Sequence, residues 1–196
     1  MKQSKVRVKP IETHYDGYKF RSRLEARWAV FFNALGIKYE YELEGYDLGE
    51  AGWYLPDFYL KNVGLRGQEQ GLWAEIKQIR PTETEEHKMI ALVLGTKKDG
   101  VILIGSPCAY PGELDTSSDG HYQYMLDPGN DGGFWWDNDM AFMKCYNCGL
   151  IKIEYTESNY LYCPTCGGRC DFNHAKINAA TVKARQARFE HGTRKG

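Results

Sequence analysis

The apolar positions near the N-terminus change from the period of a strand to the period of a helix. Residues 10–22 alternate on either side of an Asp-Gly pair at 16–17, which predicts a β-hairpin with a tight turn. From Ser22 onward apolar side chains recur at helical spacing until Gly36 ends the run. These side chains are Leu24, Trp28, Phe31 and Leu35. We therefore expect a hairpin followed directly by an amphipathic helix.

The following residues predict three strands, a second helix and a fourth strand. Residues 37–43 alternate between apolar and polar side chains, and residues 53–63 form a second strand with a proline at a bulge or sheet edge. Residues 72–79 are apolar on both faces, which favours a central strand. A helix over 81–94 leads to a short apolar run at 101–105, typical of a buried parallel strand. This order predicts an α/β fold in which a mixed β-sheet is flanked by helices.

The overall composition is that of a globular protein with a sizeable core. The chain has 196 residues, of which 42% are hydrophobic and 26% are charged. It contains no apolar run near the ~18 residues of a membrane span, and its basic start lacks the apolar stretch of a signal peptide. We therefore expect a cytoplasmic protein that does not enter a membrane. In that reducing compartment the 6 cysteines favour metal binding over disulfides.

Charge is nearly balanced overall but segregated along the chain. The net charge of -1 excludes a uniformly basic nucleic-acid-binding protein and leaves local basic faces open. Residues 1–9 and 173–196 are basic, whereas residues 99–143 carry acidic side chains and no lysine or arginine. Two basic ends favour a polyanionic partner. The acidic segment 99–143 is a candidate surface for a protein partner.

Two Cys-x-x-Cys motifs indicate a metal site. The predicted ligands are Cys145, Cys148, Cys163 and Cys166. A glycine follows each motif and supports a tight turn, and four thiolates can surround one Zn²⁺ tetrahedrally. The segment between the motifs alternates like a short hairpin, so we predict a small four-cysteine zinc ribbon that the metal stabilises. The alternative is that these four cysteines are buried or redox-active without a metal. Cys170 is either a substitute ligand or a residue with no role at the site. Cys108 is expected to be a thiol of the core or of a loop.

A second group of candidate ligands lies on the predicted sheet. Asp57 begins the second strand, and Glu75 and Lys77 lie two positions apart on the third, so both face one side of the sheet. If the two strands are neighbours, Asp57 meets that pair. Two carboxylates and the backbone carbonyl of Ile76 are hard oxygen ligands suited to Mg²⁺ or Mn²⁺. A lysine beside them can position a water molecule or stabilise the charge on a phosphate. The alternative is a cross-strand salt bridge.

Pro-Asp at 56–57 followed by Glu-Ile-Lys at 75–77 resembles the motif of the PD-(D/E)xK nuclease superfamily. The resemblance covers about residues 11–106 and implies a restriction-endonuclease-like core. The zinc ribbon and the basic C-terminal helix look like small phage- or bacterium-encoded nucleases of this superfamily. That likeness implies a bacterial or phage-infected host cell.

The resemblance also implies roles for individual side chains. Asp57 and Glu75 hold the metal, Lys77 is the catalytic lysine, and Glu25 on the preceding helix assists at the metal. Glu25 has a second interpretation, because Ser22-x-x-Glu25 is also a capping box in which the Glu25 carboxylate bonds back to the Ser22 amide.

Several other side chains are candidates for contact with nucleic acid. Arg21 and Arg23 precede the first helix and either hold phosphates or are simply solvated. A predicted C-terminal helix over 174–192 carries four more basic candidates. These are Lys176, Lys183, Arg185 and Arg188. Trp135 and Trp136 either stack on unpaired bases or plug the interface between the sheet and the ribbon.

These observations divide the chain into four segments and predict an enzyme. The segments are 1–106, a nuclease-like core with a basic N-terminal arm; 107–143, an acidic and aromatic insertion or linker; 144–172, the zinc ribbon; and 173–196, a basic C-terminal helix. We predict a metal-dependent endonuclease that hydrolyses phosphodiester bonds in DNA, or in RNA, with catalytic Mg²⁺ or Mn²⁺ and structural Zn²⁺. The alternative is a catalytically inactive nuclease-like protein that serves as a nucleic-acid- or protein-binding adaptor.

Overall fold

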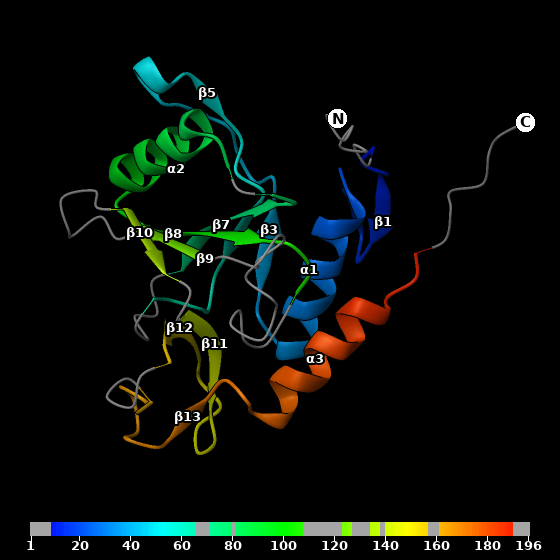
Figure 1. Cartoon of the computed structure of the whole chain (residues 1–196), viewed down its shortest axis with the longest axis vertical. Helices are drawn as coiled ribbons and strands as arrows, with labels where there is room; N and C mark the ends of the chain where they lie inside the picture. The colour runs from blue at the N-terminus through cyan, green and yellow to red at the C-terminus, as the bar shows by residue number, and fades with distance from the viewer. Residues whose placement is uncertain are drawn as a thin grey trace, which may run out of the picture.

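Figure 1 shows the structure, a computed structural model of the chain. It describes residues 9–65, 71–79, 81–107, 123–126, 134–137, 140–156 and 161–189. At residues 123–126, 134–137 and 140 the description covers the backbone and not the side chains.

A six-stranded sheet has the strand order β10-β9-β8-β7-β6-β3. Its strands are β3 (Tyr39–Tyr41), β6 (Phe58–Leu60), β7 (Leu72–Lys77), β8 (Asp99–Ile104), β9 (Gln123–Leu126) and β10 (Phe134–Asp137). β7 and β8 run parallel, and the other neighbouring pairs of this sheet are antiparallel. The predicted mixed sheet is therefore confirmed, and β7 is an interior strand, as its apolar sequence predicts.

Helices cover both faces of this sheet, as Figure 1 shows. They are α1 (Arg23–Leu35), α2 (Glu83–Thr96) and α3 (Ala175–Gln186). On one face Met89 and Leu92 of α2 share a core with Trp73 of β7. On the other face α1 shares a larger core with Ala74 of β7, and α3 packs beside α1. Within the described ranges, none of the helices is long and apolar enough to cross a membrane.

Local sequence signals account for the hairpin and for α1. The hairpin strands are β1 (Thr13–Tyr15) and β2 (Tyr18–Phe20). They are joined by Asp16 and Gly17, both with positive φ, which suits an Asp-Gly turn. Ser22 caps α1 through its side chain, and Gly36 ends the helix with a φ of 77°. The predicted hairpin and helix are both confirmed.

The predicted strand over 53–63 is split in two. Its first part is β5 (Trp53–Tyr54), which pairs with β4 (Tyr46–Asp47) around the short helix η1 (Gly49–Ala51). Its second part is β6, which begins only after Asp57. Pro56 has no amide hydrogen to continue a ladder, so the chain leaves one sheet before it and joins another after it. The break leaves the Asp57 side chain at the start of β6.

The C-terminal part forms a three-stranded sheet in the order β12-β11-β13. The strands are β11 (Met140–Cys145), β12 (Ile151–Tyr155) and β13 (Cys170–Asp171), and we call this sheet with its two Cys-x-x-Cys turns the cysteine module. The hairpin pairs β12 with β11, because the first Cys-x-x-Cys turn itself reverses the chain. The hairpin expected between the two motifs lies partly outside the described residues, and its described strand, β12, pairs with β11. Phe142, Ile151 and Ile153 of the module belong to the same core as α1.

The other predicted C-terminal features are shorter than expected or lie partly outside the described residues. The helix expected over 174–192 is α3, which ends at Gln186 and packs on α1. The insertion over 107–143 contains the β9-β10 hairpin, which extends the main sheet beyond β8. The side chains of Trp135 and Trp136, the thiol of Cys108 and most of the basic N-terminal arm lie outside the described residues.

Candidate functional site

Asp57 meets Glu75 at the point where β6 begins beside β7. The two strands are antiparallel neighbours with Phe58 opposite Ala74, so Asp57 lies next to the carboxyl end of β7. The amide of Asp57 donates to Oε2 of Glu75 at 3.2 Å, and the amide of Ile76 donates to Oδ2 of Asp57 at 2.7 Å. The amide and carbonyl of one strand residue point to the same edge, so the Ile76 carbonyl also faces Asp57. The structure thus brings together the three groups that the sequence predicts as metal ligands.

Lys77 lies beside Glu75 on the same side of β7. Its Nζ is 2.9 Å from Oε1 of Glu75 and 2.9 Å from Oε1 of Glu85, in the first turn of α2. Burial by itself lowers the pKa of Lys77, but the charge of Glu75 and the hydrogen bonds to both carboxylates raise it above its usual value. Burial opposes ionisation of Glu85 as well, yet the Thr82 amide and Lys77 lower its pKa to about 2. Lys77 is therefore an ammonium group held between two carboxylates.

The carboxylate of Asp57 is almost completely buried, with 2% of the residue exposed. Burial, followed by the charges of Glu75 and Glu25, raises the pKa of Asp57 well above its usual value, although the Arg21 charge opposes this shift. The guanidinium of Arg21 forms an ion pair with Asp57, and its Nε lies 2.6 Å from Oε1 of Glu42. Burial of several carboxylates so close together gives this site an affinity for additional positive charge.

Glu25 helps to cap α1, although its carboxylate bonds to the Ser22 hydroxyl and the Arg21 amide and not to the Ser22 amide of the expected capping box. Ser22 Oγ accepts a bond from the Glu25 amide at 3.1 Å and donates to Oε1 of Glu25 at 2.7 Å, which caps α1. The other carboxylate oxygen, Oε2, accepts from the Tyr41 hydroxyl at 2.6 Å and from the Arg21 amide at 3.0 Å. The charge of Glu25 also raises the pKa of Asp57, after burial and Glu75. Glu25 is thus a charged neighbour of the Asp57–Glu75 pair that is held in place by its own hydrogen bonds.

Glu25 does not close the pair into a three-carboxylate cluster in this arrangement. Within the described part of the chain, the one group of three or more Cys, His, Asp or Glu residues with ligand atoms within 4.8 Å of one another is the cysteine group. Direct ligation by Glu25 therefore requires a shift of its side chain toward Asp57.

Three further residues of this site carried no signal in the sequence. Tyr41 comes from β3, Tyr54 from β5 and Glu85 from α2. Burial and the charge and hydrogen bond of Glu75 raise the pKa of Tyr54 well above its usual value, so its hydroxyl stays protonated. These residues meet Glu25, Glu75 and Lys77 only through tertiary packing, so spacing along the chain does not reveal them.

The predicted nucleic-acid contacts fall in two separate regions. Arg21 and Arg23 lie at the start of α1, where Arg21 faces Asp57 and Glu42. The exposed basic side chains of α3 and of the residues just after it are Lys176, Lys183, Arg185 and Arg188. Arg185 Nε also donates to the carbonyl of Pro107 at 2.9 Å. Contact of either region with nucleic acid remains a prediction.

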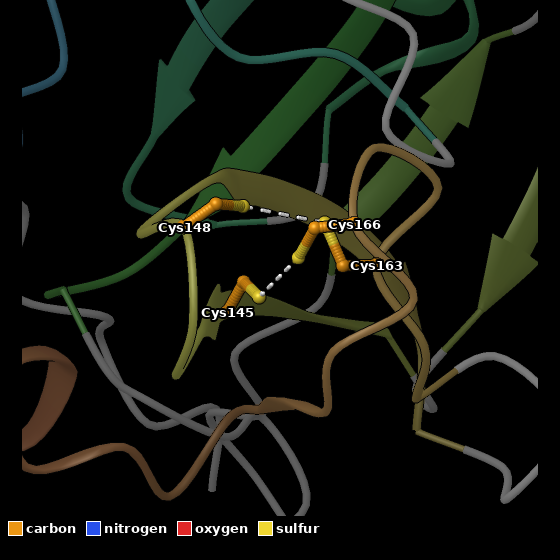
Figure 2. Close-up of side chains that lie close together, drawn as sticks. All are labelled: Cys145, Cys148, Cys163 and Cys166. Atoms are coloured by element: carbon orange, nitrogen blue, oxygen red, sulfur yellow. Dashed lines mark hydrogen bonds between the residues drawn. The ribbon is translucent and has the colours of Figure 1, made fainter.

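The four predicted zinc ligands converge at one end of the cysteine module. Figure 2 shows their sulfur atoms directed toward one another. Cys145 Sγ lies 3.6 Å from Cys166 Sγ, and Cys148 Sγ lies 3.5 Å from Cys163 Sγ. Four sulfurs around one Zn²⁺ at ~2.3 Å stand ~3.8 Å apart, whereas a disulfide would need ~2 Å. The separations are compatible with four thiolates around one ion, and the group could bind a metal such as zinc.

The backbone and two lysines support the cysteine site. Gly149 and Gly167 each close a turn by donating to the carbonyl of the first cysteine of their motif, at 3.1 and 2.9 Å, and both have positive φ. Lys144 Nζ donates to the Gly149 carbonyl at 2.8 Å and Lys152 Nζ to the Tyr162 carbonyl at 3.1 Å. These ammonium groups bring positive charge to a site that would carry net negative charge with four thiolates and one Zn²⁺.

Cys170 lies next to this site without joining the four-sulfur group. It is opposite Cys145 in the β11-β13 ladder and completely buried. Burial raises the pKa of the Cys170 thiol to about 12, which keeps it protonated. Cys170 is thus a packing residue of the module in this arrangement.

No family model, curated protein or solved structure matches the chain. The likeness to PD-(D/E)xK nucleases therefore rests on the residues at 56–57 and 75–77 and on their meeting in space. The α/β fold and the cysteine cluster are observed directly. A restriction-endonuclease-like core and its activity are proposals.

Proposed function

We propose that this protein is a metal-dependent endonuclease that hydrolyses phosphodiester bonds in DNA. The observation that carries this proposal is the meeting of Asp57, Glu75 and Lys77 where β6 joins β7. Two buried carboxylates and one lysine, separated by a strand connection, are the groups that the PD-(D/E)xK motif implies. An ordinary surface salt bridge does not need to bury both carboxylates, because burial of charge is costly without a function or a tight partner.

Asp57, Glu75 and the Ile76 carbonyl would hold Mg²⁺ or Mn²⁺. The donor set fits such an ion, because it consists of hard oxygen atoms and because burial, followed by the charges of Glu75 and Glu25, raises the pKa of Asp57. When bound, the ion activates a water molecule and neutralises charge on the phosphate under attack. Arg21 must release Asp57 Oδ1 for that oxygen to become a ligand.

Lys77 acts as a cation in this proposal. Its raised pKa keeps the proton on Nζ at neutral pH, so the group donates hydrogen bonds and does not accept a proton. Glu75 and Glu85 fix the position of Nζ from two sides. From there Nζ can stabilise the negative charge that develops on a phosphate oxygen or orient the attacking water.

The cysteine module serves the structure of the enzyme in this proposal. Its sulfur geometry suits one Zn²⁺, and its apolar side chains belong to the core that supports α1. Glu25 belongs to α1, and Arg21 immediately precedes this helix. Zn²⁺ bound by the cysteine module would therefore stabilise the helix that borders the proposed catalytic site.

One specific observation favours a second candidate function. Asp57 is paired with Arg21, and Glu75 is paired with Lys77, so the charges of the site are partly neutralised by the chain itself. A nuclease-like protein with that internal pairing can bind nucleic acid or protein without cutting. Binding without cleavage would identify this adaptor function.

The experiment that tests the proposal compares several substrates and metals. The zinc-loaded protein is incubated with supercoiled plasmid, linear duplex, single-stranded DNA and RNA, with Mg²⁺, with Mn²⁺ or with neither. The divalent ion is omitted and not chelated, because a chelator would also remove zinc from the cysteine site. Cleavage of a DNA substrate that requires Mg²⁺ or Mn²⁺ supports the enzyme, whereas binding with no cleavage supports the adaptor.

A further inference from the structure

A pocket of about 460 Å³ opens beside the Asp57–Glu75–Lys77 site. It lies between the residues that precede β1, the first turns of α1 and the carboxyl end of β7. Lys77 and Glu25 line this pocket and also belong to the candidate catalytic site. A group bound in the pocket would therefore sit directly next to the reacting phosphate.

Cationic side chains outnumber acidic ones in the pocket lining. Lys9, Arg23 and Arg27 are cationic, and Glu25 is the one acidic side chain among the lining residues. Lys77 also lines the pocket, but its charge is paired with Glu75 and Glu85. The Glu25 carboxylate is already bonded to Ser22, to Tyr41 and to the Arg21 amide. α1 begins at the pocket, and the dipole of this 13-residue helix adds partial positive charge there. The pocket is thus suited to an anion.

Arg27 is the residue of the pocket lining whose side chain is least engaged by the described part of the chain through its Nε atom. Its Nε is buried and has no hydrogen-bond partner among the described residues. A buried donor of a charged group without an acceptor costs free energy, and arginine matches the oxygens of phosphate especially well. Arg27 also lines the pocket, so its planar guanidinium is the lining group best matched to a phosphate there.

We propose that this pocket binds a second phosphate group of the nucleic acid, adjacent to the phosphate that is hydrolysed. The proposal rests on the proposed function and adds a positioning site to it, with Arg27 as the principal contact and Lys9 and Arg23 as supporting cations. The phosphate belongs either to an internal phosphodiester or to a phosphorylated strand end. In both cases the pocket fixes the register of the strand relative to Asp57 and Lys77.

Arg27→Gln tests the pocket, with Arg169→Gln as the matched control. Arg169 is an exposed arginine of the cysteine module, so its change removes the same charge away from the pocket. DNA binding is measured by fluorescence anisotropy without Mg²⁺ over a series of KCl concentrations. Arg27→Gln should weaken binding about tenfold and reduce the salt slope by ~0.9, the value for one lost phosphate contact, while Arg169→Gln leaves both unchanged.

One more variant and a set of oligonucleotides complete the test. Arg27→Lys retains the charge and should recover part of the lost affinity, and circular dichroism of each variant shows whether the fold is intact. Oligonucleotides with a 5′-phosphate, a 3′-phosphate or hydroxyl ends, and a circular single strand, identify the source of the phosphate. A loss confined to one phosphorylated end identifies terminal binding, and an equal loss on the circle identifies internal binding.

The possible failures are distinguishable. Wild-type protein that binds and cuts DNA, together with a folded Arg27→Gln variant of unchanged affinity and salt slope, overturns the pocket and leaves the proposed function intact. Wild-type protein that binds no nucleic acid overturns both.

Discussion

The amide of Ile76 donates a 2.7 Å hydrogen bond to Oδ2 of Asp57. This bond fastens the residue before β6 to the carboxyl end of β7. The reciprocal bond from the Asp57 amide to Glu75 Oε2 fixes the two carboxylates relative to each other. The backbone of the sheet thus holds the candidate metal ligands in place before any ion binds, which is the preorganisation that a catalytic metal site needs.

The raised pKa of Asp57 predicts how stability depends on pH without Mg²⁺. A carboxyl group whose pKa is higher in the folded than in the unfolded protein stabilises the fold at low pH. This stabilisation is complete when the pH lies below the unfolded-state pKa of about 3.8. That contribution is lost as pH rises through the folded-state value. As the pH rises above about 3.8, Asp57→Asn should therefore lose less stability than wild type, by at most ~1.4 kcal/mol per pH unit.

Urea unfolding of the zinc-loaded proteins in Mg²⁺-free buffer measures this difference. Adding Mg²⁺ should restore stability to wild type at pH 8 and leave Asp57→Asn nearly unchanged, because a ligand stabilises only the state that binds it. If the unfolding free energies of the two proteins changed with pH in parallel, the raised pKa of Asp57 would not be the cause of the pH dependence.

Arg21 forms an ion pair with Asp57 and would compete there with the proposed metal ion. Because its guanidinium pairs with Asp57, Arg21→Gln should tighten Mn²⁺ binding about fivefold, equivalent to ~1 kcal/mol. Lys61→Gln is the control, since it removes a lysine that pairs with Glu40 on β3 without contacting Asp57 in the described structure. Isothermal titration calorimetry measures both variants. Weaker Mn²⁺ binding by Arg21→Gln would mean that Arg21 orients the ligand and does not obstruct it.

The two roles of Glu25 can be separated by mutation. Ser22→Ala removes the cap and should cost about 1 kcal/mol of stability with cleavage largely retained. Glu25→Gln keeps oxygen and nitrogen atoms near Ser22 and Tyr41 but removes the charge, and should lower kcat about tenfold or more. Denaturation midpoints and plasmid cleavage rates give the two readouts. Full activity in a folded Glu25→Gln variant would leave Glu25 as a capping residue alone.

The cysteine site predicts one zinc ion per chain. Cys148→Ser should lower zinc content and destabilise the whole chain by about 3 kcal/mol or more, because β11 and β12 share their core with α1. For a chain of this size such a loss lowers Tm by roughly 6–12 °C. Cys170→Ala should keep its zinc, since Cys170 lies outside the four-sulfur group. Elemental analysis and thermal unfolding check this, and a zinc-replete Cys148→Ser protein would contradict it.

Most of the main sheet follows from local patterns, but the surroundings of the site do not. Alternation placed Glu75 and Lys77 on one face, and the continuous apolar character of β7 indicated an interior strand. Pro56 was expected at a bulge or edge, yet it ends one ladder before another begins, because its missing amide breaks the strand. Tyr41 and Glu85 reach the site from elements that only tertiary packing brings near. Arg21 was a candidate for either a phosphate contact or a solvated role, and in this structure it pairs with Asp57.

The central claim is that Lys77 and the two carboxylates beside it form a hydrolytic site. The most direct measurement is the rate of Mg²⁺-dependent plasmid cleavage by Lys77→Ala, with Lys38→Ala, an exposed lysine beyond the far end of α1, as control. We expect a loss of about 10²-fold or more for Lys77→Ala, with unchanged zinc content and circular dichroism, and wild-type cleavage for Lys38→Ala. Wild-type cleavage by a folded Lys77→Ala protein would contradict the claim.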